Sequence, residues 1–376
     1  MSDRNTVFSI VPPFTLLVTF LMLMAMPVHA QSYDAPWWLP GGHLQTIYSA
    51  LFTVVPQVSY KRERWETPDG DFIDVDWLID VDEQAPAAAN ISTADGPLVI
   101  FFHGLEGNSE RHYVRSLMGE LQRKGWRGIA VNFRGCSGEP NRLPRAYFAG
   151  DSTEIDWILR RVRAQYPATP LFATGVSLGG NALLKWVGEQ GAHAGEVIDA
   201  VVTVSAAMDL QAMGNTLDQG GFNQFYTDHF LHSLKKKAAY KLEQFPGLFD
   251  REAVNNVKTL REFDDLVTAP LHGFKNTDDY WTRASSKPHL IDIRIPTLLI
   301  HARNDPFLPE TALPAPAEVS SSVTLEFSDE GGHVGFISGP FPGKHAWLPE
   351  RILAFFSEVN DNLPPSAFSF SPSAPH

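Results

Sequence analysis

The sequence predicts an α/β domain with a doubly wound, mostly parallel sheet and a helical cap insertion. Two patterns lead to this prediction. Between residues 97 and 204, short continuous apolar runs alternate with longer amphipathic segments, as in a parallel sheet that is covered by helices on both faces. The alternation stops between about 207 and 290 and then resumes. We therefore expect one domain over residues 31–360 with an insertion inside it.

The first strands of this domain are expected to form a hairpin. Residues 60–66 and the alternating apolar positions of 73–79 flank the turn residues Pro68-Asp69-Gly70. The segment 81–96 is rich in alanine with scattered acidic and polar residues, and we expect it to be an exposed loop.

The continuous apolar runs are expected to be the buried strands of the sheet. These runs are residues 98–102, 129–131, 171–174, 200–204, 297–300 and 323–327. Amphipathic segments predict helices around residues 114–122, 155–162, 179–186 and 347–359.

The insertion of about residues 207–290 is expected to be a helical cap over the site. It has helical and aromatic segments but no clear strand pattern, and it contains Phe222, Phe225, Tyr226, Phe230 and Leu231. Any one of these aromatic residues could simply belong to the core of the cap. Taken together, they predict an apolar pocket for an acyl chain. The tail 361–376 is rich in Pro and Ser and is predicted to be disordered.

Charge and cysteine content argue against several classes of protein. The chain has 30 Lys and Arg against 43 Asp and Glu, a net charge of −13, which disfavours binding of nucleic acid. The triplet Lys235-Lys236-Lys237 is interpreted as a solvated helix face. The single cysteine, Cys136, excludes an intramolecular disulfide framework and a cysteine-clustered zinc site.

The most specific motif is Gly175-Val176-Ser177-Leu178-Gly179, which follows a predicted strand and opens a predicted helix. The turn between such a strand and helix is too sharp for side chains at the flanking positions, and it projects the serine oxygen above the end of the sheet. We therefore predict that Ser177 is a nucleophile. The alternative is a serine that only caps the helix.

A serine nucleophile needs a base and a carboxylate that orients the base, in the chain order Ser, Asp, His for this type of fold. Asp305 and His333 each follow a predicted strand, at the edge where a doubly wound sheet presents its site. Asp209 competes as the acid. His301 competes as the base but precedes Asp305 and breaks the order.

Acyl transfer also needs hydrogen-bond donors for the developing oxyanion. We expect them to be the backbone N–H groups of Leu178, directly after the nucleophile, and of Leu105, in the loop after an earlier strand. His103 in this loop is interpreted as stabilising the loop, and Cys136 as a packed loop residue.

No metal or cofactor is expected. The histidines His43, His112 and His229 show no metal-ligand spacing with nearby carboxylates.

Several stretches of the sequence resemble the YheT-like hydrolases, family 4 of the AB hydrolase superfamily. The matching segments are Gly42-His43-Leu44-Gln45-Thr46, residues 102–107, residues 132–141, residues 177–181, residues 261–265 and residues 331–336. The resemblance implies an α/β-hydrolase fold and a catalytic triad of Ser177, Asp305 and His333. It also implies a carboxylesterase or acylglycerol lipase that acts on short- to medium-chain esters.

The residues and the resemblance together predict a serine hydrolase of carboxylic esters whose partner is a small-molecule ester or acylglycerol. An acyltransferase would use the same residues, and a non-catalytic binding protein on this fold is the remaining alternative. The sequence carries no signal for an oligomeric state.

Residues 1–30 resemble a secretory signal or a membrane anchor. The run from Val7 to Met26 has no charged residue, and Val28-His29-Ala30 resembles a small-x-small cleavage site. The start is barely basic, however, and Pro12-Pro13 interrupts the run, whereas initiation at Met26 would remove nearly all of it. We slightly favour a cytoplasmic location. The alternative, if residues 1–30 are used, is membrane association through the leader or a periplasmic location.

Overall fold

The computed structural model describes residues 32–80, 90–91 and 96–364. The predicted leader 1–30 and residues 365–376 of the predicted tail lie outside the described residues. Within these ranges, one sheet has the strand order β1-β2-β5-β4-β6-β7-β8-β9, and β3 pairs with β2. The strands of the sheet after the hairpin are β3 (Asn90–Ile91), β4 (Leu98–Phe102), β5 (Arg127–Asn132), β6 (Leu171–Val176), β7 (Ala200–Val204), β8 (Thr297–Ala302) and β9 (Val323–Ser328).

The predicted hairpin is present as β1 (Ser59–Glu66) and β2 (Phe72–Asp80). Its turn needs glycine because Gly70 has a φ of 84°. Strand β2 pairs antiparallel with β5, whereas all pairs from β5 through β4, β6, β7 and β8 to β9 are parallel. The mostly parallel α/β sheet predicted from the apolar runs is therefore confirmed.

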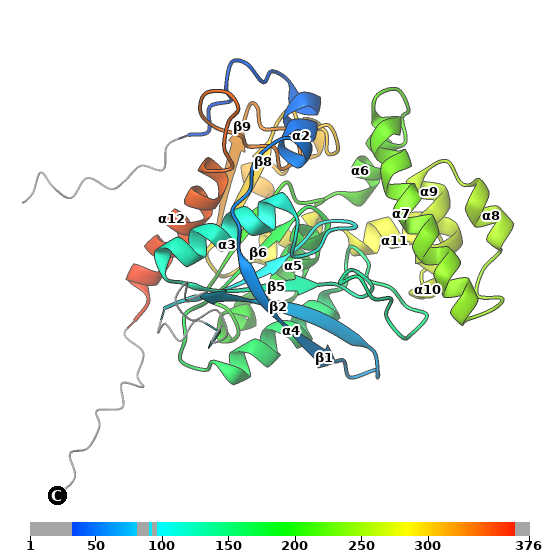
Figure 1. The fold of residues 1–376 in the computed structure, drawn as a ribbon, viewed down its shortest axis with the longest axis horizontal. Helices are drawn as coiled ribbons and strands as arrows, with labels where there is room; N and C mark the ends of the chain where they lie inside the picture. The colour runs from blue at the N-terminus through cyan, green and yellow to red at the C-terminus, as the bar shows by residue number, and fades with distance from the viewer. Residues whose placement is uncertain (1–31, 81–89, 92–95, 365–376) are drawn as a thin grey trace, which may run out of the picture. The chain divides into compact units, whose positions relative to one another are not determined.

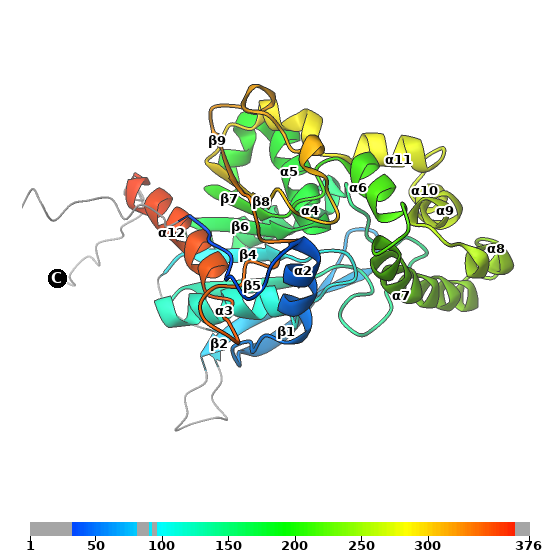
Figure 2. The same ribbon diagram turned by 90° about the horizontal axis from the view of Figure 1, so that it is seen from above.

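Two layers of helices cover the sheet, as Figure 2 shows from above. Helices α3 (His112–Lys124) and α12 (Trp347–Asn362) lie on one face, and α4 (Ser152–Gln165) and α5 (Leu178–Gln190) lie on the other. Helix α3 buries Val114, Leu117, Met118 and Leu121, the stripe expected of an amphipathic helix. Across the sheet, α5 is buried along nearly its whole length, because the helices beside it and the cap enclose it.

Residues 207–290 contain helices and no strand. The helices in and next to this segment are α6 (Leu210–Leu217), α7 (Asn223–Gln244), α8 (Arg251–Asn256), α9 (Leu260–Phe263), the π-helix Asp264–Thr268, α10 (Ala269–Leu271), α11 (Thr277–Ala284) and the 3-10 helix Lys287–Asp292. Figure 1 shows α7 to α10 gathered beyond one end of the sheet.

The structure also departs from the sequence predictions. Helix α2 (Gly42–Leu51) was not predicted. Within the expected loop 81–96, residues 90–91 form strand β3, whereas 81–89 and 92–95 lie outside the described residues. Helix α12 continues to Asn362, two residues into the predicted tail. Among the described helices, none is both long and apolar enough to cross a membrane.

Asn181 on α5 joins the cap to the sheet domain. Its buried side-chain amide donates to the carbonyl oxygens of Ala149 at 2.7 Å and Ala284 at 2.8 Å. Its Oδ1 accepts from the N–H of Ser286 at 2.9 Å. One side chain thus satisfies three backbone groups from two segments, the loop before α4 and the end of the cap.

We predict that Asn181→Ala lowers the free energy of unfolding by about 2–4 kcal/mol, because it leaves these buried backbone groups unpaired. Urea unfolding measures this change. The exposed Asn256→Ala is the matched control and should shift stability by less than about 0.5 kcal/mol. Equal effects of the two substitutions would contradict the role of Asn181.

Candidate active site

Ser177 lies at the turn between β6 and α5 in a strained backbone conformation, with φ 53° and ψ −118°. Such positive φ values are uncommon for residues other than glycine. The turn depends on close backbone approach, since a Cβ on Gly179 would lie 2.4 Å from the carbonyl oxygen of His103. A Cβ on Gly175 would lie 2.7 Å from the carbonyl oxygen of Gly179. The glycines of the predicted motif are therefore required by the geometry of the turn.

The side chain of Ser177 makes no capping hydrogen bond to helix α5, so it does not act as the helix cap that was the alternative interpretation. Ser177 instead lines a pocket together with Leu178 and Leu105. Leu178 is the first residue of α5, and N–H groups in the first turn of a helix have no partner within the helix. The structure thus brings the predicted nucleophile and both predicted oxyanion residues to one pocket.

Asp305 and His333 lie together at the ends of neighbouring strands. His333 Nδ1 is 2.8 Å from Oδ2 of Asp305, which leaves Nε2 as the nitrogen free to exchange a proton. Phe307 connects this pair to the pocket, because it lines the pocket and its ring stacks on His333 with centroids 4.1 Å apart. The geometry suits an imidazole held in one orientation by a carboxylate.

The carboxylate of Asp305 is fully buried and remains charged. Burial raises its pKa, but the charge and hydrogen bond of His333 and the nearby His301 lower it by more, so that its pKa lies well below the usual range. Oδ1 also accepts from the N–H of Phe307 at 2.8 Å. This carboxylate can therefore stabilise a positive charge on His333.

The two competing residues have other contacts. Asp209 is the N-cap of α6 and accepts from the N–H of Ala212 at 2.9 Å. His301 is buried on β8, and its Nε2 lies 3.2 Å from Oδ2 of Asp305. His301 thus lies against the same carboxylate as His333.

His103 bonds to the backbone on both sides of its ring. Its Nδ1 lies 2.7 Å from the carbonyl oxygen of Gly104, and its Nε2 accepts from the N–H of Phe133 at 3.2 Å. Burial lowers the pKa of His103 to about 4. A neutral ring with two backbone partners fits the predicted role in stabilising the loop.

Cys136 is buried as expected, and burial raises its pKa to about 11. Nζ of Lys237 from the cap lies 3.2 Å from its sulfur, a contact that the local sequence does not indicate. The expectation that residues 235–237 are a solvated face is wrong in part, since only Lys236 of the three is exposed.

Glu106 connects the cap to the loop that carries Leu105 through hydrogen bonds and an ion pair. Its Oε1 accepts from Nζ of Lys237 at 2.7 Å and from the hydroxyl of Tyr147 at 2.8 Å. Its Oε2 accepts from the hydroxyl of Ser233. Helix α7 and the Leu105 loop are therefore joined by one buried carboxylate.

The cap supplies most of the apolar wall of the pocket. Its lining residues are Leu210, Met213, Leu217, Phe230, Leu234, Phe249, Leu260, Phe263, Val267, Leu271, Tyr280 and Trp281. Of the aromatic residues named in the sequence analysis, only Phe230 is among them. Phe222 and Phe225 are exposed instead, and Tyr226 lies behind Phe307 with ring centroids 4.7 Å apart.

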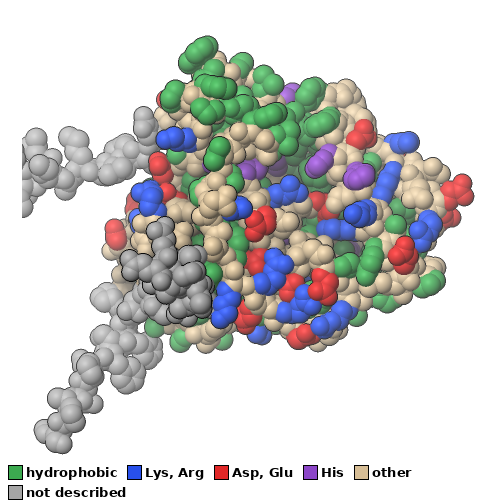
Figure 3. All heavy atoms as spheres, in the orientation of Figure 1, with side chains coloured by type: hydrophobic (Ala, Val, Ile, Leu, Met, Phe, Trp, Pro, Cys, Tyr) green, Lys and Arg blue, Asp and Glu red, His purple; other side chains and the backbone are tan. Residues whose placement is uncertain are grey.

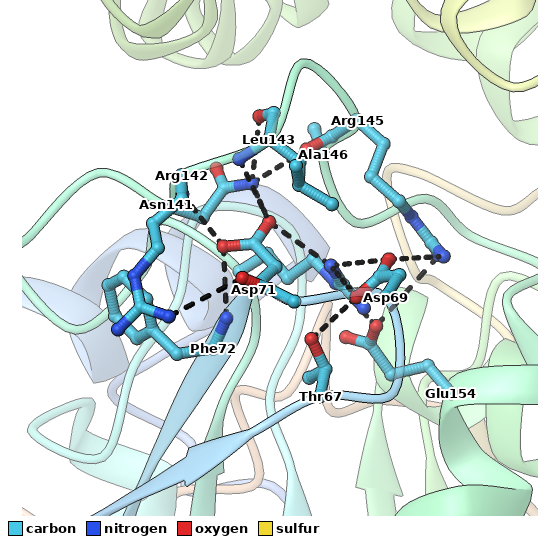
Figure 4. A network of polar contacts seen from close by, with 12 residues as sticks. Thr67, Asp69, Asp71, Phe72, Asn141, Arg142, Leu143, Arg145, Ala146 and Glu154 are labelled. Atoms are coloured by element: carbon cyan, nitrogen blue, oxygen red, sulfur yellow. Dashed lines mark hydrogen bonds and ion pairs between the residues drawn. The ribbon is translucent and has the colours of Figure 1, made fainter.

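A buried ionic network holds the opposite wall, the loop of residues 134–146 (Figure 4). Arg134 binds Asp71 through Nη1 at 3.1 Å and Glu154 through Nε at 2.6 Å. The side chain of Asn141 donates to Asp71 at 2.6 Å and to the carbonyl oxygen of Arg145 at 2.7 Å. Since Arg134 and Asn141 also line the pocket, these contacts fix its shape.

Two residues of helix α2 that were not predicted as site residues hold the acid and base loops together. Oε1 of Gln45 accepts from the side-chain amide of Asn304 at 3.0 Å and from the N–H of Gly331 at 2.8 Å. Oγ1 of Thr46 accepts from the N–H of His333 at 2.8 Å. Both residues belong to the segment Gly42–Thr46 that was noted for its resemblance, and that segment was the only signal for them.

Among the described residues, no group of three or more His, Cys, Asp or Glu side chains could hold a metal ion. The polar groups around Ser177 are those of a nucleophile, a base, an acid and backbone donors, a set that suits acyl transfer.

Comparisons with known proteins identify the family of the chain. The alpha/beta hydrolase fold family matches residues 97–340. The chain is 38% identical to "Putative esterase YheT" of Escherichia coli (strain K12), over 82% of this chain and 88% of that protein. It is 30% identical to "Phospholipase ABHD3" of Mus musculus, over 89% and 80% of the two chains. It is 26% identical to "Monoacylglycerol lipase" of Saccharomyces cerevisiae, over 86% and 80%.

We predict that Gln45→Ala lowers the free energy of unfolding by about 2–4 kcal/mol, because three polar groups, two of them in buried contacts, lose their partner. Those groups are the carbonyl of Leu39, the amide of Asn304 and the N–H of Gly331. Urea unfolding measures the effect. The exposed Gln57→Ala serves as control, and a Gln45→Ala protein as stable as that control would refute the prediction.

Proposed function

The chain belongs to the alpha/beta hydrolase fold family, and from this premise we propose that it hydrolyses carboxylic esters through an acyl-enzyme formed on Ser177. The observation that carries the proposal is the strained turn that holds Ser177 at an apolar pocket beside Leu178 and Leu105. The relatives described as an esterase, a phospholipase and a monoacylglycerol lipase support ester hydrolysis as the reaction.

In the proposed mechanism, Nε2 of His333 takes the proton of the Ser177 hydroxyl as its oxygen attacks the ester carbonyl carbon. The N–H groups of Leu178 and Leu105 stabilise the resulting oxyanion. The ester C–O bond then breaks, and His333 returns the proton to the departing alcohol. His333 then takes a proton from water as the water oxygen attacks the acyl-enzyme. The bond between the acyl carbon and Ser177 Oγ breaks, His333 returns the proton to Oγ, and the carboxylic acid leaves. Asp305 stays ionised throughout and stabilises the imidazolium.

We further propose short- to medium-chain apolar esters, such as acylglycerols, as substrates. The walls of the pocket are mainly aliphatic and aromatic side chains from the cap, which suits an acyl chain better than a charged substrate. The relative described as a monoacylglycerol lipase is consistent with this substrate class.

Ser177→Ala is expected to lower kcat for p-nitrophenyl butyrate by at least about 10⁴-fold, because no other group can form the acyl-enzyme. The urea concentration at the midpoint of its unfolding should be close to that of the wild type, which shows that the variant is folded. Near-normal turnover by the purified, folded variant would eliminate the proposed mechanism.

Asp305→Asn is expected to reduce kcat by less than Ser177→Ala does, because the carboxylate orients and stabilises the base and does not attack the ester. The matched comparison is Asp209→Asn, which removes a charge but keeps an N-cap for α6, since Asn caps helices about as well as Asp, and it should leave kcat within about threefold. If Asp209→Asn reduced kcat more than Asp305→Asn, the acid would have been assigned wrongly.

Phe230→Ala is expected to shift the chain-length preference of the enzyme, because it enlarges the pocket wall. The ratio of kcat/KM for p-nitrophenyl octanoate to that for the butyrate should rise severalfold. Phe225→Ala, an exposed residue on the same helix, is the control and should leave the ratio unchanged. An unaltered ratio in a folded Phe230→Ala protein would argue against an acyl pocket at this position.

A further inference from the structure

One face of the molecule, around helix α2, is built from segments without charged residues. We call it the uncharged face and define it as residues 35–60, 219–227 and 334–343, none of which is Lys, Arg, Asp or Glu. Charged side chains reach its border from other segments: Arg115 donates to the carbonyl oxygen of Pro56 and to Gln57, and Glu330 accepts from the N–H of Gly41. Figure 3 shows hydrophobic side chains gathered over α2, with the charged side chains lying mostly away from them. In a chain of net charge −13, a surface region of this kind calls for an explanation.

Large apolar side chains stand out from this face. Trp37 is 92% exposed, Phe341 73%, Leu51 67% and Phe52 65%. Most of the large exposed apolar residues among the described part of the chain belong to the uncharged face; they are Trp37, Leu44, Leu51, Phe52, Val54, Phe222, Phe225 and Phe341. Contiguous apolar surface of this kind marks interaction sites.

The aromatic residues of the face form a connected layer. The ring of Trp38 lies 5.4 Å from that of Phe341 and 5.2 Å from that of Tyr48, and Tyr48 lies 5.6 Å from Phe52. The polar atoms of this layer already have partners within the chain. Trp38 Nε1 donates to the carbonyl oxygen of Gly339 at 3.1 Å. The hydroxyl of Tyr48 donates to the carbonyl oxygen of Pro342 at 2.9 Å.

A second group of rings on the uncharged face leads to the candidate active site through the start of the cap. His43 on α2 lies 4.5 Å from Phe222, between ring centroids. Tyr226, one turn further along the cap helix, contacts Phe307, which stacks on His333. The uncharged face therefore borders the pocket that holds Ser177.

We propose that the uncharged face binds the surface of a lipid bilayer, so that the pocket opens beside the lipid. A protein partner would need hydrogen-bonding groups at about one per 100–200 Å² of interface, whereas Trp38 and Tyr48 have already satisfied theirs within the chain. Exposed Trp, Phe and Leu side chains suit the boundary between lipid headgroups and acyl chains, where an indole N–H can still meet water.

The order of the sequence supports the same partner. The segment Val7–Met26 also contains no charged residue, and only residues 27–34 separate it from the uncharged face. A short segment, residues 27–34, thus joins two apolar parts of the sequence, Val7–Met26 and the uncharged face, both of which suit contact with lipid. This inference concerns binding and does not depend on the proposed hydrolysis.

The lack of charge also predicts that binding depends little on the charge of the lipid headgroups. Burial lowers the pKa of His43, so the one histidine on α2 is mainly neutral at pH 7. Binding should therefore depend on apolar insertion. It should change little with salt or when about a fifth of the phosphatidylcholine is replaced by phosphatidylserine, because no basic cluster is there to attract anionic lipid.

The test is flotation of the full-length chain with phosphatidylcholine vesicles. The wild-type protein should float with the vesicles, and the double variant Leu51→Glu/Phe52→Glu should lose at least about tenfold in partition coefficient. Leu266→Glu/Ile291→Glu is the matched control, because these exposed apolar residues lie outside the uncharged face. It should bind vesicles as the wild type does. Both double variants should keep the urea unfolding midpoint of the wild type, which shows that they are folded.

Three results would overturn the proposal. Wild-type protein that does not float has no lipid-binding face. Equal flotation of the wild type and Leu51→Glu/Phe52→Glu would assign binding to another part of the chain. Wild-type protein that sediments as a dimer without lipid, and becomes a monomer in Leu51→Glu/Phe52→Glu, would assign the face to a second copy of the chain.

Discussion

The left-handed backbone of Ser177 is the constraint on which the rest of the site depends. A non-glycine residue in this conformation costs about 1–3 kcal/mol and persists only where the surroundings enforce it. Here the N–H of Ser177 donates to Val204 O at 3.0 Å, and its carbonyl accepts from Ala207 N at 3.2 Å. The end of β7 thus holds the turn, while glycines allow the neighbouring backbone to approach it. The sheet provides the stability that keeps the serine at the pocket.

The base and acid depend on a different support. Asp305 and His333 lie on loops after β8 and β9, and helix α2 bridges these loops through Gln45 and Thr46. Backbone contact reinforces the bridge, since a Cβ on Gly42 would lie 1.9 Å from the carbonyl oxygen of Asn304. Helix α2 therefore has two faces with different tasks. One holds the acid and base loops, and the other carries the exposed apolar side chains.

The sequence predicted the sheet well because its strands are continuous apolar runs between helices, a pattern with few alternatives. The glycine-serine motif predicted Ser177, which the structure places at the pocket. The positions of Asp305 and His333 after predicted strands led to these two residues, which the structure places beside Phe307. Helix α2 was missed because Gly41-Gly42 and Pro40 precede it and its apolar residues are largely exposed. The contacts of Gln45, Glu106 and Lys237 join segments far apart in the chain, which local patterns do not reveal.

The central claim, a nucleophilic Ser177, is tested most directly by reacting the native protein with a fluorophosphonate and mapping the modified peptide by mass spectrometry. The account predicts one adduct per chain, located on Ser177, with no reaction after unfolding in urea, because the serine is activated only within the folded site. An adduct on another residue, or native protein that does not react, would contradict it.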